Sequence, residues 1–189
     1  MLHDLTLEGY GTRLVPLDES HAAGLAAFVD DRIWAGMTTP TPQGVDAMRS
    51  WITTAQAQPG RLSFAVLDQA TGAVRGSTSY YDLEPHVGRV EIGNTFYAPV
   101  WWGTTNNPAC KYLLLRHAFE ELGLVRVAFR ADVLNTRSVA AIERLGAVRE
   151  GVLRRHRLRT DGTRSDSVYL SILAEEWPAA RDGLLARLA

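Results

Sequence analysis

The sequence has a single cysteine, Cys110, among 189 residues, which excludes an internal disulfide and a cysteine-rich zinc site. No apolar run approaches the roughly 20 residues that a membrane-spanning helix needs. The N-terminal segment MLHDLTLEG lacks the basic and then apolar order of a signal peptide. The five histidines show no spacing typical of metal ligands. These absences favour a cytoplasmic protein without a metal site.

A strong charge of either sign is also missing, because the formal net charge is -1. Nothing therefore attracts the whole chain to nucleic acid or to an anionic membrane. Hydrophobic residues make up 46% of the chain and charged residues 22%, which is ordinary for a globular protein. The length predicts one domain over residues 1–189, large enough to bury a core.

Hydrophobic periodicity and turn residues predict an alternation of strands and helices. Strands are expected at Leu5–Leu17, Leu62–Leu67, Val74–Leu83, Arg89–Tyr97, Val125–Val133, Ala147–Arg159 and Ser165–Leu173. Helices are expected from Asp18 or Ser20 to Val29, then at Gln43–Gln56, Pro108–Leu122, Asn135–Leu145 and Ala174–Leu188, with Asp30–Pro42 irregular. A helical crossover between two strands requires a parallel pair, whereas the short turns require antiparallel ones. The order predicts a mixed, mainly antiparallel α/β sheet with helices on both faces.

The stretch Glu91–Gly123 combines a strand, a loop of small residues at Gly103–Asn107, and a helix expected to begin at Pro108. Backbone amides at such a junction can hold a phosphate, and the helix dipole favours an anion there by roughly 0.3–1 kcal/mol per group. The alternative is that Asn107 and Pro108 only cap and begin a helix.

Four segments, in order along nearly the whole chain, resemble the GNAT N-acetyltransferase superfamily, and in particular its Rim-type branch of ribosomal-protein N-terminal acetyltransferases. They are TRLVPLDESHAAGL from Thr12, VEIGNTFYAPVWWGT from Val90, KYLLLRHAFEELGLVRVAFRADVLNTRSVAAIERLGA from Lys111, and REGVLRRHRLRTDGTRSDSVYLSIL from Arg149. The combination is specific, whereas any one segment alone is weak. The resemblance implies a GNAT-like sheet whose parallel central pair is splayed.

The resemblance also implies acetyl-CoA as cofactor. Its pyrophosphate would lie on the loop amides between Trp102 and Pro108, and its pantetheine arm would pair with the strand end at Asn94–Tyr97. The thioester would lie in the splay beside Val125–Val133, and Asn135 and Ser138 match the family element that contacts pantetheine. The implied cofactor-binding residues are Asn94, Thr95, Phe96, Tyr97, Trp102, Gly103, Thr104, Thr105, Asn106, Asn107, Lys111, Asn135 and Ser138.

The loop departs from the family pattern. Val100 and Thr105 stand where the pattern usually has Gln or Arg and a small residue, and Pro108 removes one backbone donor. We therefore expect a CoA site that relies on loop amides and threonine hydroxyls. Asn106 and Lys111 are further candidates for phosphate contacts, with a solvated helix lysine as the alternative for Lys111.

Acetyl transfer requires a base for the attacking amine, and the resemblance assigns it to Glu91, acting through a water. Strand alternation places Glu91 on one face with Arg89, Gly93 and Thr95. The alternative is a structural ion pair of Glu91 with an arginine such as Arg89 or Arg130. A backbone amide near Thr95 or Phe96 would stabilise the oxyanion.

The family's general acid, a tyrosine on the short helix, corresponds here to Ile142. Ser138 is the replacement candidate, although capping the helix that begins at Asn135 explains it equally well. A covalent mechanism through Cys110 is disfavoured, because the sequence places no histidine or aspartate to activate the thiol.

Trp34, Tyr80 and Tyr81 are candidates for the acceptor pocket, with core packing as the alternative for each. The basic cluster Arg154–Arg159 has three arginines sharing one strand face, which would attract an acidic substrate or the CoA phosphates. A solvated or salt-bridged face is the alternative.

The leading hypothesis is an enzyme that moves an acetyl group from acetyl-CoA to a primary amine, either a protein N-terminal α-amine or a small molecule. A non-catalytic CoA-binding or sensor protein on the same scaffold is the alternative. A nucleic-acid or ribosome-binding module is a third hypothesis, against which the net charge of -1 argues. By analogy with the branch, a homodimer is expected.

Overall fold

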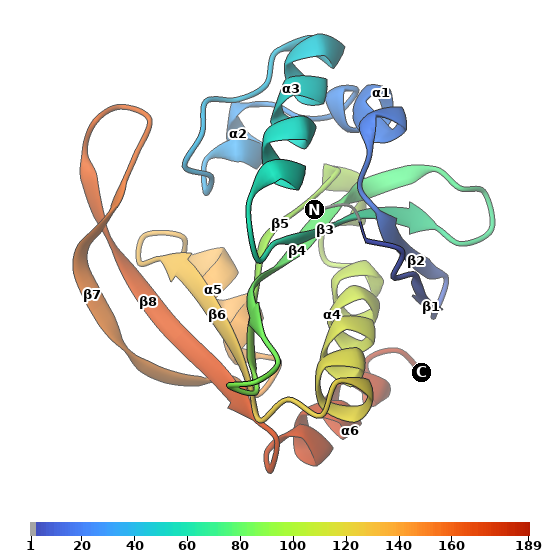
Figure 1. Ribbon diagram of the computed structural model, residues 1–189, viewed down its shortest axis with the longest axis vertical. Coiled ribbons are helices and arrows are strands. Elements are labelled where there is room, and N and C mark those ends of the chain that lie inside the picture. Colours follow the sequence, from blue (N-terminus) through green and yellow to red (C-terminus); the bar gives the residue numbers. More distant parts are fainter. Residues whose placement is uncertain (1–2) are drawn as a thin grey trace.

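One eight-stranded sheet, in the order β1-β2-β3-β4-β5-β6-β8-β7, forms the frame of the computed structural model, which describes residues 3–189 (Figure 1). The strands are β1 (Leu7–Gly9), β2 (Thr12–Pro16), β3 (Leu62–Asp68), β4 (Val74–Glu84), β5 (Arg89–Tyr97), β6 (Arg126–Asp132), β7 (Val148–Leu158) and β8 (Arg164–Leu173). Only β5 and β6 pair in parallel; the other neighbours are antiparallel. The predicted mixed, mainly antiparallel sheet is confirmed.

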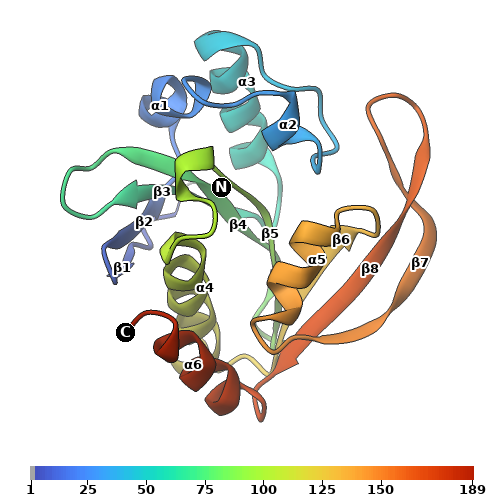
Figure 2. The ribbon, with the colours of Figure 1, turned by 180° about the vertical axis from the view of Figure 1, so that it is seen from behind.

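Helices cover the sheet in two groups (Figure 2). They are α1 (Ala22–Ala26), α2 (Asp31–Trp34), α3 (Gly44–Ala57), α4 (Asn106–Arg116), α5 (Thr136–Glu143) and α6 (Trp177–Ala186). One apolar cluster joins the sheet to α4, α5 and α6, and a second joins it to α1, α2 and α3. Short 3-10 turns precede α1 and α4, and a π-helical turn over His117–Glu121 extends α4.

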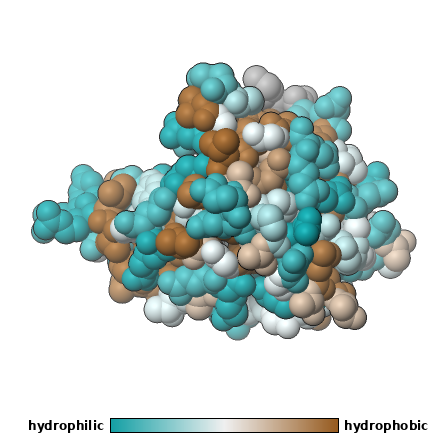
Figure 3. Space-filling model, turned by 90° about the horizontal axis from the view of Figure 1, so that it is seen from below, coloured by the Kyte–Doolittle hydropathy of each residue, from teal (hydrophilic) through white to brown (hydrophobic). Residues whose placement is uncertain are grey.

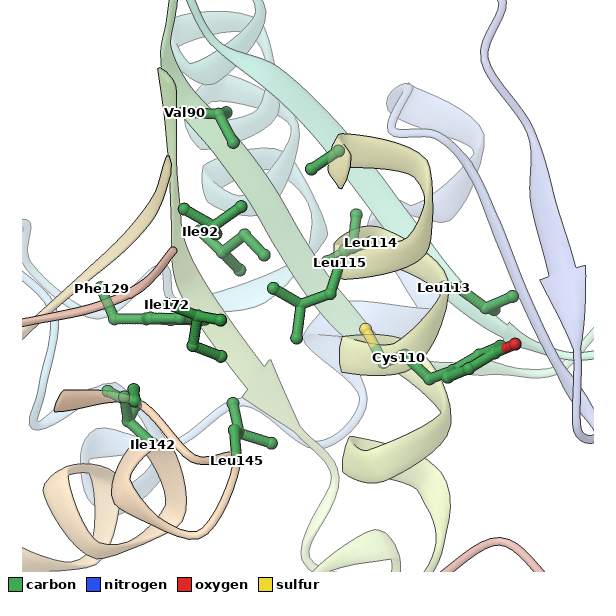
Figure 4. Close-up of a cluster of buried hydrophobic side chains, with 14 of the residues drawn as sticks. Val90, Ile92, Cys110, Leu113, Leu114, Leu115, Phe129, Ile142, Leu145 and Ile172 are labelled. Carbon is green, nitrogen blue, oxygen red and sulfur yellow. The ribbon is translucent and has the colours of Figure 1, made fainter. Parts of the chain in front are cut away.

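Helix α4 is buried along nearly its whole length. Figure 4 shows Val90 and Ile92 of β5 beside Leu114 and Leu115 of α4, with Ile142 and Leu145 at the opposite end of the same cluster. The outer side of α4 contacts β1, β2 and α6. Each fully buried leucine contributes about 1.5–3 kcal/mol, so packing on both sides fixes the helix firmly against the sheet.

The parallel ladder between β5 and β6 is short. It runs from Arg89 opposite Arg126 to Ile92 opposite Phe129, although both strands continue beyond these residues. In Figure 1, β6 and β8 lean away from β3–β5 above their common lower end. The predicted splay of the central pair is therefore present, and it opens after Ile92.

Three predicted boundaries were wrong. The first strand is instead a hairpin of β1 and β2, because Tyr10 and Gly11 both have positive φ (53° and 69°) and form a two-residue turn. The segment predicted as irregular contains α2, which Asp30 caps by accepting from the Ile33 N–H. Helix α4 begins at Asn106, two residues before Pro108.

The surface mixes polar and apolar side chains, as Figure 3 shows for the face seen from below. Edge strand β7 is exposed along nearly its whole length and carries exposed Val148, Val152 and Leu153. Among residues 3–189, the helices are all too short or too polar to cross a membrane.

Candidate functional site

Strand β5 contains a β-bulge where the strands part. Ser79 pairs with Gly93 and Ser77 with Phe96, so two residues of β5, Asn94 and Thr95, face one residue of β4. Asn94 takes a left-handed conformation with φ 50°. The extra residue inverts the alternation, so the prediction that Thr95 shares a face with Glu91 was wrong. Thr95 contacts α4, whereas Phe96 packs with α1–α3.

Glu91 lies buried on the other face of β5. Its Oε1 is 3.2 Å from the guanidinium of Arg130, which also donates to the Tyr169 hydroxyl at 3.0 Å. Burial raises the pKa of Glu91, and the charge of Arg130 opposes that rise. The ion pair with Arg130 is thus present, yet the raised pKa also brings this carboxylate closer to the range of a general base.

A pocket of about 170 Å³ opens beside Glu91. Asp82, Tyr169 and the first residues of β5 and β6 line it. Tyr81 lies next to it: a Cβ built on Gly93 would be 3.4 Å from the Tyr81 ring and 3.6 Å from Glu91 Oε1. A larger hollow of about 410 Å³ lies between α5 and α6 and contains none of the predicted site residues. The pocket beside Glu91 is therefore the better position for an acceptor.

Two predicted acceptor residues pack in the core instead. Tyr80 is fully buried, and its hydroxyl donates to the Leu114 carbonyl of α4. Trp34 is 3% exposed, and its indole N–H donates to the Thr39 carbonyl at 3.0 Å. Its ring stands edge-on against Phe96. Of the three aromatic candidates, only the half-buried Tyr81 lies beside Glu91.

The loop before α4 presents free backbone donors. Gly103 turns the chain with φ 75°. The Thr104 hydroxyl donates to the Trp101 carbonyl at 2.9 Å and accepts the Asn106 N–H at 3.2 Å. Within the part of the chain that the structure describes, no intramolecular hydrogen bond uses the N–H groups of Gly103, Thr104, Thr105 and Asn107. These donors, at the start of an 11-residue helix, form a cradle suited to a phosphate.

The side chains of Asn106 and Asn107 form hydrogen bonds with other parts of the protein. Asn106 is 2% exposed and its Oδ1 accepts from Arg75 at 3.2 Å, while its Nδ2 is buried without a hydrogen-bond partner within residues 3–189. A contact of Asn106 with a phosphate remains a prediction. Asn107 lies inside the helix rather than at its cap, and its Oδ1 accepts from the Tyr97 hydroxyl at 3.2 Å. The position of the N-cap is instead occupied by Thr105, whose side chain makes no capping bond.

Three arginines that the sequence did not indicate surround this loop. The guanidinium of Arg75 lies 3.9 Å from the centre of the Trp101 ring. Those of Arg32 and Arg137 lie 5.2 and 4.0 Å from the Trp102 ring. They come from β4, α2 and α5, so no spacing along the chain could have revealed the cluster. Arg75 forms an ion pair with Asp68, so the positive charges of Arg32 and Arg137 are the ones that favour an anion at the loop.

Residues 12–148 match the family described as an acetyltransferase (GNAT) domain. The chain belongs to the GNAT family. The predicted resemblance to this family is confirmed, and the name of one relative supports the Rim-type branch.

Named GNAT relatives support this assignment. The chain is 37% identical to the "Putative ribosomal N-acetyltransferase YdaF" of Bacillus subtilis (strain 168) over 106 residues, which cover 56% of this chain and only 57% of that protein. It is 38% identical to a T. thermophilus protein described as a "putative acetyltransferase", with a TM-score of 0.91 and full coverage of both chains. Mycobacterium smegmatis RimJ, solved in complex with CoA-disulfide, shares the fold at 23% identity, with a TM-score of 0.80 over 97% of this chain and 94% of that one.

Helix α5 of this GNAT chain has the predicted N-cap at Asn135. Asn135 Oδ1 accepts the Ser138 N–H at 3.1 Å. The Ser138 hydroxyl is half-buried and has no hydrogen-bond partner within residues 3–189. Contacts of either residue with pantetheine remain a prediction.

The lysine of the GNAT helix α4 is not solvated, so that alternative was wrong. Lys111 is 5% exposed, and its Nζ donates to Thr95 Oγ1 at 2.9 Å. Burial lowers the pKa of Lys111 to about 8. Its neighbour Cys110 is fully buried with a raised pKa, which does not favour a thiolate nucleophile.

Two arginines of the cluster at Arg154–Arg159 are engaged within the protein, whereas Arg154 and Arg155 are exposed. Arg159 forms an ion pair with Asp132 at 2.9 Å, and Arg157 donates to the Gly36 carbonyl at 3.0 Å. Arg155 has φ 52° within an irregular part of the β7–β8 ladder, so the predicted alternation of this face is broken. The salt-bridged alternative describes Arg159.

Proposed function

We propose that this protein transfers an acetyl group from acetyl-CoA to a primary amine, and that the amine is a protein N-terminal α-amine. The observation that carries the proposal is the set of unpaired loop N–H groups at the start of α4, beside the gap between β5 and β6. The buried carboxylate of Glu91 faces a pocket beside the paired part of β5, one residue before the last β5–β6 pair. Donor and acceptor can therefore approach each other from two sides of one strand.

The residues present fit the diphosphate and pantetheine of the acyl donor, which is a substrate of the reaction. The free N–H groups of Gly103, Thr104, Thr105 and Asn107 would hold the diphosphate, with Arg32 and Arg137 nearby. The backbone of β5 beyond Ile92 has lost its β6 partner and would pair with the pantetheine amides. The buried Asn94 Nδ2 has no hydrogen-bond partner within residues 3–189 and would gain an acceptor from the pantetheine arm.

Glu91 would accept the proton that the amine loses as it attacks the carbonyl carbon, directly or through a water in the adjoining pocket. Arg130 holds the carboxylate in place, and its charge opposes the rise in pKa that burial causes. Tyr81 would contact the acceptor, because it lies against Gly93 on the same face. A backbone N–H at the bulge would stabilise the oxyanion.

The choice of a protein N-terminus rests on the resemblance to the Rim-type branch, which is supported by the relative described as a putative ribosomal N-acetyltransferase. A small-molecule amine is the competing acceptor class. A homodimer is part of the same proposal and is tested by its mass in solution.

Two measurements test the proposal. Calorimetry should detect acetyl-CoA binding, and no heat at millimolar ligand would contradict it. Release of CoA thiol should then be followed with peptides that have a free N-terminus, the same peptides with a blocked N-terminus, and small amines. Turnover confined to free N-termini supports the proposal, whereas turnover confined to small amines changes the acceptor class.

A non-catalytic CoA sensor is the second candidate, because Ile142 stands where the family's tyrosine acid is expected. It predicts heat of binding without release of thiol for every amine in the panel. The same two measurements therefore separate the candidates.

A further inference from the structure

Lys111 is the only lysine in this chain, since the other residues among its 20 lysines and arginines are all arginines. The distinction matters chemically. A guanidinium keeps its proton in proteins, whereas a buried ammonium can release one near neutral pH. This single lysine lies inside α4 with 5% of its surface exposed.

The ammonium has no counter-charge. Its hydrogen bond to Thr95 Oγ1, at 2.9 Å, is the one that the structure gives it, although an ammonium has three donors. Within residues 3–189, no carboxylate lies within 4.0 Å of it. Cys110, next to Lys111 on α4, interacts with Tyr97 of β5 and Tyr80 of β4; burial raises the pKa of all three, so all are neutral at pH 7. A buried charge without a partner is costly, and such costs are concentrated at functional sites.

The groups around Lys111 are rich in donors. Thr95 Oγ1 is also 2.8 Å from the Thr78 hydroxyl, which forms a chain of two hydroxyls that ends at the ammonium. Asn94 Nδ2, next in sequence, is buried without an acceptor. Thr95 and Asn94 both lie at the bulge, just beyond the last β5–β6 pair at Ile92. The site therefore lacks an acceptor, which an incoming ligand would supply.

We propose that Lys111 is the proton source for the leaving group of the acetyl transfer, acting through the hydroxyl of Thr95. This inference rests on the proposed function. As the amine nitrogen bonds to the carbonyl carbon, the carbon–sulfur bond breaks and sulfur keeps the electron pair. Sulfur takes the proton of the Thr95 hydroxyl, which is replaced from Lys111 Nζ. Glu91 takes the proton lost by the amine, and the neutral lysine regains its proton from solvent.

The acidity of Lys111 suits this role. Burial lowers its pKa to about 8, close to the value of about 8.5 for an ordinary thiol, so the transfer is nearly balanced in free energy. The hydroxyl of Ser138, the other candidate, makes no hydrogen bond within residues 3–189. Lys111 would then act as the general acid, which is otherwise missing because Ile142 stands in place of the family's tyrosine.

Nuclear magnetic resonance can test the contact without measuring activity. Protein labelled with ¹³C-lysine gives one lysine signal, whose pH titration should show a pKa near 8 in the free protein. CoA should shift this titration, whereas desulfo-CoA, which keeps the phosphates and pantetheine but lacks sulfur, should not reproduce the shift. An identical response to both ligands would show that Lys111 is not connected to the sulfur through Thr95 and would overturn the proposal. If neither ligand binds by calorimetry, the proposed function fails instead.

Kinetics of matched variants test the proton transfer. In the native enzyme, kcat should fall as the pH rises through about 8. Lys111→Met should lower kcat by about 100-fold and abolish this alkaline limb, with little change in acetyl-CoA affinity. Lys111→Arg keeps the positive charge, but a guanidinium does not release its proton near pH 8, so this variant should not restore the rate. Thr95→Ser should retain the limb and Thr95→Val should lose it. A native alkaline limb in Lys111→Met, or full rescue by Lys111→Arg, would refute the proton transfer.

Discussion

The two faces of β5 bury opposite charges in opposite ways. On one face, Glu91 lies 3.2 Å from Arg130, which offsets part of the cost of burying the carboxylate. On the other face, Lys111 donates to the hydroxyl of Thr95, and within residues 3–189 no carboxylate lies within 4.0 Å to offset the cost of its charge. The side chains of Glu91 and Thr95 are brought to opposite faces by the bulge at Asn94.

The proposed roles of Glu91 and Lys111 explain why only Glu91 has a partner of opposite charge. A carboxylate that must be ionised to accept a proton benefits from a nearby cation, whereas an ammonium that must lose a proton benefits from having no nearby anion. The paired side therefore suits a base, and the unpaired side suits an acid.

The largest effect is expected on stability when the unpaired charge is removed. The pKa of Lys111 is about 8 in the folded protein and about 10.4 when unfolded, so its burial costs about 3 kcal/mol wherever both states are protonated. Below about pH 8, Lys111→Met should therefore be more stable than the native protein by up to about 3 kcal/mol. That advantage should shrink as the pH rises towards about 10.4. Denaturant unfolding across this range measures it, and a pH-independent difference would contradict the unpaired charge.

The next largest effect concerns the paired side. Glu91→Gln should lower kcat by about 100-fold at neutral pH, because it removes the base while keeping the shape of the side chain. Acetyl-CoA affinity should be unchanged by calorimetry. Glu84→Gln is the matched control, since Glu84 also pairs with an arginine, Arg89, but on the surface. Equal rates for the two variants would remove Glu91 from the mechanism.

A smaller effect is expected when Glu91 loses its partner. Arg130→Gln removes the charge that opposes the raised pKa of Glu91, so that pKa should rise further. The base is active when ionised, and the acid limb of kcat/KM should therefore move to higher pH. Arg116→Gln, which breaks a surface pair with Glu121, should leave the limb in place. An unchanged limb in Arg130→Gln would show that this arginine does not tune the carboxylate.

The smallest effect on stability is expected at Gly93, between Tyr81 and Glu91. A Cβ there would make ordinary contacts at 3.4 and 3.6 Å, so Gly93→Ala should change the free energy of unfolding by about 0.5 kcal/mol or less. The added methyl group would nevertheless narrow the space beside the base, and KM for the amine should rise. Thermal unfolding and steady-state kinetics measure the two quantities. A large loss of stability would contradict the contacts described.

Sequence periodicity was sufficient for most of the sheet, because strands β3 to β8 are long and bounded by turn residues. It failed at Tyr10, since tyrosine rarely adopts the positive φ that the two-residue turn requires. Periodicity also failed to predict the bulge at Asn94, because a single asparagine within an alternating strand does not indicate a bulge.

The environment of Lys111 could not be predicted for a different reason. An amphipathic helix normally leaves one face to solvent, and a lysine is expected there. Helix α4 is covered on its outer side by α6 and the β1–β2 hairpin, which lie far away in sequence. The arginines around Trp102 share this origin, because they come from α2 and α5.

The bulge at Asn94 also determines which genetic changes β5 can tolerate. If β5 kept its length but lost the bulge, Phe96 would turn away from Trp34 and Tyr97 away from α4, so two hydrophobic clusters would each lose an aromatic ring. Deleting the Asn94 codon would instead remove the bulge and its extra residue together, and both rings would stay on their present faces. Backbone conformation is therefore more constrained than length at this point. Descendants of this gene should keep a residue that accepts positive φ at position 94 or lose the residue altogether.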